Sequence, residues 1–228
     1  MRTVVLVPYR ADRGHRDRLW QHLKTHYWAD LPYPLIVGHH DGGPYNRSAA
    51  INTAARSAGD WDVAIIADSD TWVPVSQLTD AVRQAGTGGQ LVSALTAVAE
   101  LDARCTAEIL SGCVDFLNIG LERVRSGELD TQSSMLAVPR ALWDNIGGFD
   151  ERFAGWGGED NAFWRAATIL GGRPNRVDGY AYHLWHQMAI SRQERRKDPE
   201  YQANYQLWHR YSLANNAQAL RRTQGRQP

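Results

Sequence analysis

The sequence predicts an α/β fold in which a mostly parallel sheet is flanked by helices and followed by a C-terminal helical extension. Three observations support this prediction. Apolar runs alternate with helix-length segments, the runs are rich in β-branched residues, and the 228 residues include 43% hydrophobic side chains. Such a chain can bury one sizeable core. We therefore divide it into a domain at residues 1–187 and an extension at residues 188–228.

The first half of the chain alternates between strand and helix signals. Continuous apolar runs predict buried strands at residues 3–8, 34–38 and 62–67. A polar segment of helix length separates the first two runs, and residues 46–59 carry alanines at helical spacing before a glycine. Strands that alternate with helices predict a parallel sheet covered on both faces.

The middle of the chain has weaker signals. We expect a helix at residues 73–86 and a strand at residues 90–98. Residues 100–130 are either a long loop or an insert that shapes an acceptor site. The segment 133–149 predicts a strand and then a helix whose first turn contains Pro139 and which ends at a Gly-Gly pair.

Three elements are expected near the end of the chain. A helix begins at Glu159, and the run GYAYHLWH predicts a last strand that carries two histidines into a loop. The remaining residues predict a polar helix that docks through Tyr205, Trp208 and Leu213.

Charge and composition exclude several classes of function. The formal net charge is zero, so a nucleic-acid partner is not expected. The extension carries eight basic and three acidic residues against 17 and 22 in the body, and a solvated helical face explains that excess. No signal peptide or transmembrane stretch stands out, and two cysteines make no disulfide framework, so we expect a cytoplasmic protein.

An Asp-Ser-Asp sequence follows the third predicted strand. In open parallel sheets ligands bind at the carboxyl ends of the strands, which is where Asp68 and Asp70 lie. Two close carboxylates repel each other unless a cation intervenes, and hard oxygen ligands suit Mg²⁺ or Mn²⁺. A ligand from His183 or His186 would favour Mn²⁺. Alternatively, Asp68 caps a turn, Asp70 is solvated and the histidines are core or surface residues.

A glycine-rich segment precedes two adjacent acids. Gly157 and Gly158 allow the backbone to approach a ligand, and Trp156 is either a platform for a sugar ring or a core residue. Glu159 and Asp160 fall in the first turn of a predicted helix, where acids complement the helix dipole. Their mutual repulsion would also raise one pKa and improve that carboxylate as a general base toward an acceptor hydroxyl.

Four motifs recur in the same order in a known family. They are VPYR at residues 7–10, YNRS at 45–48, DSD at 68–70, and GGF followed by GWGGED between residues 147 and 160. This set resembles GT-A-fold glycosyltransferases, and most closely the β-1,4-galactosyltransferase and chondroitin-polymerase-like group with its galactosyltransferase C-terminal region. The resemblance spans about residues 3–187 and implies a GT-A-like, Rossmann-like fold.

The resemblance implies a donor side to the site. Pro8, Tyr9 and Arg10 are similar to the first-strand segment that contacts the donor nucleotide. Arg47 is similar to an arginine that approaches the donor, and Asp68 belongs to the family's DxD segment beside it.

The resemblance also implies a metal site for Mn²⁺ or Mg²⁺. Both Asp68 and Asp70 match the DxD segment, in which the second aspartate is the more consistent direct ligand. His183 best fits the third protein ligand, and His186 is the alternative by a shift of register.

On the acceptor side, Trp156, Gly157 and Gly158 correspond to a mobile loop that closes over donor and acceptor. Glu159 would bind sugar hydroxyls and Asp160 would be the catalytic base. Fewer acids follow this pair than in the galactosyltransferases, so the acceptor contacts differ. The retaining polypeptide N-acetylgalactosaminyltransferases have Asn after the Glu, so Asp160 favours inversion.

The implied function is metal-dependent transfer of a hexose or N-acetylhexosamine from a nucleotide sugar, with UDP as the expected nucleotide, to an acceptor hydroxyl. The acceptor would be a carbohydrate, a glycoconjugate or another hydroxyl compound. The alternatives are a non-catalytic nucleotide-sugar or carbohydrate binding protein, a retaining glycosyltransferase and a metal-dependent phosphoesterase. A peripheral membrane contact or a homodimer contact through the C-terminal helix stays open.

Overall fold

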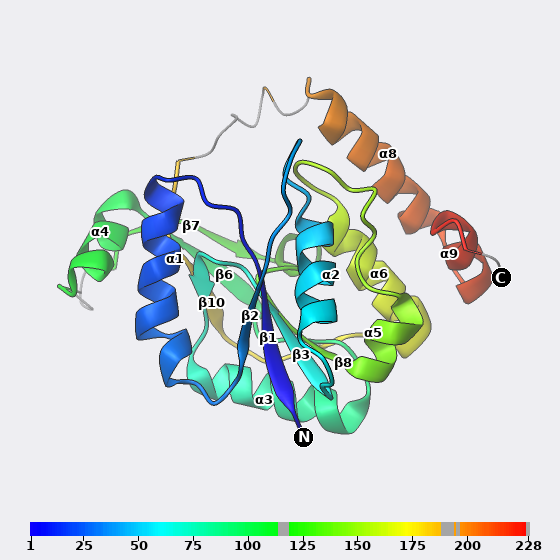
Figure 1. Ribbon diagram of the computed structural model, residues 1–228, viewed down its shortest axis with the longest axis horizontal. Helices are drawn as coiled ribbons and strands as arrows, with labels where there is room; N and C mark the ends of the chain where they lie inside the picture. The colour runs from blue at the N-terminus through cyan, green and yellow to red at the C-terminus, as the bar shows by residue number, and fades with distance from the viewer. Residues whose placement is uncertain (114–118, 188–193, 195–196, 227–228) are drawn as a thin grey trace.

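A six-stranded mixed sheet lies at the centre of the molecule (Figure 1). The computed structural model describes residues 1–113, 119–187, 194 and 197–226. The strands of this sheet have the order β2-β1-β3-β8-β5-β9. Their bounds are Thr3–Pro8 (β1), Leu35–Gly38 (β2), Val63–Ala67 (β3), Val92–Ser93 (β5), Met135–Pro139 (β8) and Asn175–Arg176 (β9).

Five of these six strands run in the same direction. β1 is parallel to β2 and β3, and β5 is parallel to β9, whereas β8 is antiparallel to both β3 and β5. The predicted mostly parallel sheet is therefore confirmed, with β8 as the exception. Because β1 and β3 are parallel neighbours, their carboxyl ends meet at one edge of the sheet.

Helices cover both faces of the sheet. Alternate side chains of β1 point to opposite faces, so Val4 and Leu6 belong to one buried cluster and Val5 and Val7 to the other. The first cluster includes α2, α5, α6, α8 and α9, and the second includes α1, α3 and α4. The helices are His15–His26 (α1), Arg47–Ser57 (α2), Val75–Gly88 (α3), Ala103–Ser111 (α4), Arg140–Ile146 (α5), Glu159–Gly171 (α6), Pro199–Leu213 (α8) and Ala217–Thr223 (α9), with short 3₁₀ helices at Trp28–Asp30 (η1) and Leu129–Thr131 (η2).

A second, four-stranded sheet has the order β4-β10-β6-β7. Its strands are Thr71–Trp72 (β4), Ala97–Leu101 (β6), Leu121–Ser126 (β7) and Tyr180–His183 (β10). The single strand predicted at residues 90–98 is wrong, because the chain forms β5 in the first sheet and then β6 in the second. Ser93 bridges this bend, since its buried hydroxyl donates to the carbonyl of Leu95 at 3.0 Å. No glycine or proline lies between the two strands, so no turn residue signals the crossing.

The stretch 100–130, which the sequence leaves unassigned, contains α4 and β7. Asp102 caps α4 by accepting a hydrogen bond from the N–H of Cys105 at 2.7 Å. β7 is largely exposed and lacks an alternating apolar pattern, so its signal is weak. Ion pairs to Glu100 from Arg123 (2.9 Å) and Arg125 (2.7 Å) hold it on β6. Residues 114–118 lie outside the described residues.

The helix expected after Pro139 is α5, although Pro139 is the last residue of β8 and the helix starts one residue later. Pro139 pairs with Val63 at the start of β3. The predicted Gly-Gly ending is present, because Gly147 caps α5 with a φ of 85°. A left-handed residue of this kind ends a helix at little cost only when it is glycine.

The C-terminal helices pack on α6 and on the first buried cluster. The predicted docking residues Tyr205 and Leu213 are wrong, since they are 61% and 67% exposed, and only Trp208 packs against the cluster. The buried stripe of α8 instead contains Asn204, Leu207 and Tyr211. Because Asn204 is polar, the apolar periodicity of the sequence does not indicate this buried stripe. Residues 188–193 and 195–196 of the predicted extension lie outside the described residues. Among the described residues of the whole chain, no helix is long and apolar enough to cross a membrane.

Candidate active site

The candidate site begins at the carboxyl end of β3. All five residues of β3 are buried, and the chain leaves the sheet at Asp68. The Asp70 side chain is 7% exposed, against 23% for Asp68. A buried carboxylate is costly unless cations or hydrogen-bond donors surround it. The neighbours of these two aspartates therefore decide what each one does.

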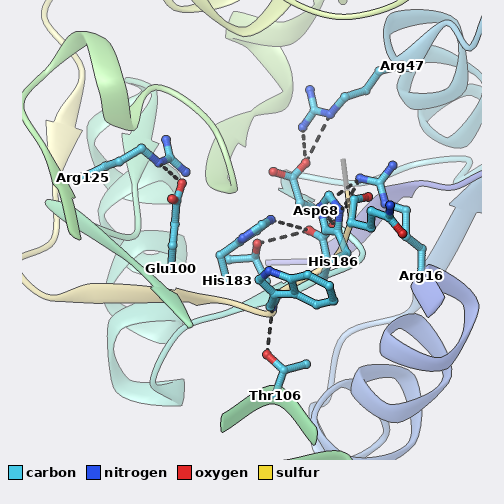
Figure 2. Close-up of polar contacts among 12 residues, drawn as sticks. Arg16, Arg47, Asp68, Glu100, Thr106, Arg125, His183 and His186 are labelled. Carbon is cyan, nitrogen blue, oxygen red and sulfur yellow. Dashed lines mark hydrogen bonds and ion pairs between the residues drawn. The ribbon is translucent and has the colours of Figure 1, made fainter. Parts of the chain in front are cut away.

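Both predicted histidines, His183 and His186 (Figure 2), lie beside Asp70. β10 ends at His183, which pairs with Thr71, so the strand register places this imidazole next to Asp70. The N–H of Leu184 also donates to the carbonyl of Asp70 at 2.9 Å. His183 Nε2 lies 3.6 Å from Asp70 Oδ1, and His186 Nε2 lies 3.4 Å from Asp70 Oδ2. One ligand atom from each of the three residues lies within 4.8 Å of the others. The structure thus brings both histidines to Asp70.

This group of atoms fits a divalent cation. Two atoms that bind one ion at about 2.1 Å lie about 3.0–3.4 Å apart, and each imidazole nitrogen lies near this distance from one oxygen of Asp70, at 3.6 Å for His183 and 3.4 Å for His186. One carboxylate oxygen with two imidazole nitrogens suits Mn²⁺ better than Mg²⁺. His186 Nδ1 lies 3.2 Å from the carbonyl oxygen of Gln187, which assigns the proton to Nδ1 and the lone pair to Nε2. Burial lowers the pKa of His186 and thereby favours the neutral ring that a metal ligand requires.

Arg16 on α1 is a fourth member of this group. Its Nη2 donates to Asp70 Oδ2 at 3.3 Å and lies 3.4 Å from His186 Nε2. Burial would raise the pKa of Asp70, but the imidazoles and Arg16 hold it below its ordinary value. The sequence did not predict this role, because nothing in RGHRDR distinguishes Arg16 from Arg13 or Arg18. Arg16 reaches Asp70 and His186 because of where α1 packs in the folded protein.

Asp68 belongs to a second cluster, centred on Arg47. Asn46 caps α2 by accepting from the N–H of Ala49 at 2.8 Å, which starts the helix at Arg47. Arg47 Nη2 donates to Asp68 Oδ1 at 2.6 Å, and its Nη1 donates to Asp160 Oδ1 at 2.6 Å. The structure therefore places Asp68 with Arg47. Within the described residues Asp68 is not a member of the metal-binding group.

Glu159 and Asp160 lie at the first turn of α6, as the sequence predicts, and both face Arg47. Glu159 Oε1 lies 4.0 Å from Arg47 Nη1. Burial raises the pKa of Asp160 to about 8, and the charges of Glu159 and Asp68 add to this, while Arg47 opposes it. Burial likewise raises the pKa of Glu159. Three carboxylates thus share one guanidinium, and the cluster holds a proton near neutral pH.

The glycine-rich loop lies between this cluster and α8. Gly158 precedes α6 with a φ of 93°, and an added Cβ would lie 2.9 Å from Phe153 Cε1. Only glycine fits there without strain. Asn204 on α8 is buried and donates to the carbonyl of Ala154 at 2.7 Å and to that of Trp156 at 3.3 Å. The loop is therefore held by α8, which lies in the segment predicted to be a C-terminal extension.

Trp156 is not a core residue, because 58% of it is exposed. Its ring stacks on Tyr201 of α8, with 5.8 Å between the centroids and an angle of 21° between the planes. Gly157 lies beside the same tyrosine, since a Cβ there would be 3.6 Å from Tyr201 Cε2. An exposed aromatic face next to a buried acid pair has the shape and chemistry to receive a sugar ring.

The predicted donor residues lie at the end of β1, at the same edge of the sheet as Asp68. Tyr9 donates to Asp17, and Arg10 donates to the carbonyl of Gly43 at 2.9 Å. Both line a cleft of about 290 Å³, whereas Pro8 ends the strand. A larger cavity of about 510 Å³ has Trp61 in its wall, and none of the predicted site residues lines it.

Tyr45 is the first residue of the YNRS motif, and the sequence does not predict a role for it. Its hydroxyl is buried and has no hydrogen-bond partner among the described residues. Burial raises the pKa of Tyr45 to about 12, and Arg47 and Asp68 are among the charges that act on it. A buried hydroxyl without a partner is costly and is commonly completed by a ligand or by water.

A family model described as the N-terminal domain of galactosyltransferase matches residues 128–187. This segment contains the glycine-rich loop, the acid pair and both histidines, so the resemblance seen in the sequence is confirmed over it. No curated protein matches the chain.

Several solved structures are similar to the chain. A Drosophila β-1,4-galactosyltransferase 7 mutant in complex with manganese, UDP-Gal and xylobiose is 15% identical with a TM-score of 0.54, over 87% of this chain and 80% of that one. Glucosyl-3-phosphoglycerate synthase from Mycobacterium tuberculosis, with Mn²⁺, UDP and glucosyl-3-phosphoglycerate, is 16% identical at 0.52, over 94% and 81%. S. aureus TarS is 14% identical at 0.52, over 80% and 60%. These likenesses confirm the predicted GT-A-like fold.

Proposed function

We propose that the chain is a metal-dependent glycosyltransferase that moves a sugar from a nucleotide-sugar donor to an acceptor hydroxyl. One observation carries this proposal: a cation-binding group and a partly buried acid pair lie at the same edge of the sheet. Asp70, His183 and His186 form the first, and Glu159 with Asp160 forms the second. The GT-A-like fold and the galactosyltransferase segment support it.

Asp70, His183 and His186 would hold Mn²⁺, or Mg²⁺ with lower preference. A divalent cation there supplies the positive charge that stabilises a departing diphosphate. The similar structures with Mn²⁺ and UDP make UDP the nucleotide of choice in this proposal. Asp68 has a different task, since it holds Arg47 in position.

The donor side of the site is built by residues of β1 and the segment before α2. Tyr9 and Arg10 line the cleft that would receive the nucleotide. The buried Tyr45 hydroxyl has no hydrogen-bond partner among the described residues, so it can donate a hydrogen bond to the sugar or the phosphates of a nucleotide sugar. Arg47 keeps its charge despite burial, because Asp160, Asp68 and Glu159 raise its pKa.

Asp160 is the proposed base. Its carboxylate takes the proton from the acceptor hydroxyl as that oxygen bonds to the anomeric carbon and the bond from this carbon to the diphosphate oxygen breaks. Attack from the face opposite the diphosphate inverts the anomeric configuration. A pKa near 8 suits a base at neutral pH, because the group then accepts a proton readily and is partly ionised. Glu159 would bind acceptor hydroxyls, and Trp156 would stack on the acceptor ring.

We place this activity in the cytoplasm. Cys105 is buried, Cys113 is exposed, and neither forms a disulfide. Two unpaired thiols, one of them accessible, fit a reducing compartment.

The test is sugar transfer from a panel of UDP-sugars to simple glycosides, with Mn²⁺ or with EDTA, measured by mass spectrometry of the products. Donor binding is measured in parallel from the rise in melting temperature. We expect Mn²⁺-dependent transfer by the wild type and by the control Asp144→Asn, whose carboxylate is 56% exposed on α5. Asp160→Asn should bind the donor and lose transfer.

Two results would count against the proposal. Donor binding with equal, negligible transfer by wild type and Asp160→Asn indicates a binding protein. Release of phosphate or UDP at the same rate with and without an acceptor glycoside indicates a phosphoesterase.

A further inference from the structure

Arg16 occupies a position that the proposed function does not explain. It lies in the first turn of α1, and its side chain is 52% exposed, yet its Nη2 atom reaches the deeply buried Asp70. The same atom lies 3.3 Å from Asp70 Oδ2 and 3.4 Å from His186 Nε2. Asp70 and His186 are two of the three residues that would bind a divalent cation.

The contacts of Arg16 use the electron pairs that a cation needs. With the proton of His186 on Nδ1, Nε2 has a single lone pair, which accepts from Arg16 or binds a metal but cannot do both. A guanidinium and a divalent ion that share Asp70 would also repel each other strongly in a buried site. Arg16 must therefore move away when a divalent cation binds.

The local structure allows such a movement without changing α1. The N–H of Arg16 donates to Asp12 Oδ2 at 3.2 Å, and Asp12 also accepts from the N–H groups of Gly14 and Asp17 at 2.7 and 3.2 Å. These bonds hold the backbone of the first turn. The Arg16 side chain beyond them is half exposed, so it can change rotamer at low cost.

We infer that Arg16 is a second phosphate-binding group of the site, held on Asp70 and His186 until a divalent cation displaces it onto the diphosphate of the donor. This inference rests on the proposed function. A guanidinium displaced from a carboxylate pairs well with a diphosphate, because the phosphate oxygens offer it a bidentate partner. Arg16 is accordingly a positioning residue for the nucleotide and not a metal ligand.

The exchange couples the binding of the cation to that of the nucleotide. Without nucleotide, the cation must break the Arg16 contacts and nothing replaces them. With nucleotide, Arg16 gains a new partner, so the cation binds more tightly. The same coupling raises nucleotide affinity when the cation is present, because binding free energies are reciprocal.

The experiment is a titration of the purified full chain with Mn²⁺, followed by the EPR signal of free Mn²⁺, with and without UDP. It compares wild type, Arg16→Gln and the control Arg18→Gln, which removes the same charge from an exposed position on the same helix. Far-UV circular dichroism and melting temperature establish that all three proteins are folded. No turnover is needed for this readout.

We expect Arg16→Gln to bind Mn²⁺ alone about fivefold more tightly than wild type, since a half-exposed ion pair no longer competes. The factor by which UDP strengthens Mn²⁺ binding should fall by about fivefold or more. Arg18→Gln should match wild type in both measurements.

Equal Mn²⁺ affinity and an equal UDP factor in wild type and Arg16→Gln would overturn the inference, while Mn²⁺-dependent sugar transfer by the same wild-type sample would leave the proposed function standing. A similar change in Arg18→Gln would also overturn it, because general charge and not the Arg16 contact would then be responsible. Absence of Mn²⁺ binding in every protein, with and without UDP, contradicts the inference and the proposed function together.

Discussion

Asp70, which is buried, and Asp160, which is partly buried, are two carboxylates of one site in opposite electrostatic surroundings. Burial alone would raise the pKa of both. Around Asp70, two imidazoles and Arg16 outweigh burial and lower the pKa. Around Asp160, Arg47 is shared with two further acids, and the pKa rises to about 8. The neighbours therefore favour the anionic form of Asp70 and the protonated form of Asp160.

The largest effect that separates the two aspartates should be the rate of sugar transfer in Asp160→Asn. Loss of a general base costs about 10²–10⁴-fold. In wild type, kcat/KM should rise with pH through about 8, because a base acts only when ionised and the pKa of Asp160 is raised. Asp160→Asn should lose this rising limb. A variant that keeps the limb at reduced rate would assign the base to another residue.

The next effect distinguishes Asp70 from Asp68 as the cation ligand. Asp70→Asn should weaken Mn²⁺ binding by about 100-fold or more, because it removes a direct ligand, whereas outer groups typically cost about 10–100-fold. Asp68→Asn should change Mn²⁺ affinity less, since Asp68 pairs with Arg47. Isothermal titration with Mn²⁺ in the presence of UDP provides both values. The reverse ranking would place the ion at Asp68 and contradict the comparison.

The smallest expected effect is on stability. The ordinary pKa of an aspartate applies to the unfolded chain, so the folded protein binds the Asp160 proton more tightly and loses stability as the pH rises from about 4 to about 8. Asp160→Asn removes this loss. In the absence of Mn²⁺ and donor, its melting temperature at pH 8 should exceed that of wild type by about 2–4 °C, if about 1 kcal/mol is recovered.

The control for this measurement is the same pair of proteins near pH 4.5, where the wild-type carboxyl is protonated when folded and the difference should become small. A difference that stays constant from pH 4.5 to pH 8 would mean that the substitution acts through packing and not through charge.

The sequence predicts this fold well where its pattern is local. The apolar runs at β1 and β3 continue without interruption, and the alanines of α2 have helical spacing, so each element carries its own signal. β5 and β6 could not be separated, because the bend between them contains no glycine or proline. β7 could not be predicted either, since it depends on ion pairs with Glu100 from another strand.

The same limit applies to the site. Asp70 and Asp160 could be selected because each stands in a distinctive local motif at the end of a strand or the start of a helix. Arg16 and Asn204 could not, because each is one polar residue of a polar helix and gains its role from tertiary contacts. The resemblance favours Asp70 over Asp68 as the direct metal ligand, but the sequence does not predict that Asp68 pairs with Arg47, because that pairing depends on tertiary neighbours.

The most direct test is an anomalous difference map from crystals of the protein soaked with Mn²⁺ and UDP. We expect one strong peak in contact with Asp70, His183 and His186, beside the diphosphate, with Asp68 still paired to Arg47. A peak bound by Asp68 without Asp70, or three side chains pointing away from a peak elsewhere, would contradict the division of labour between the two aspartates.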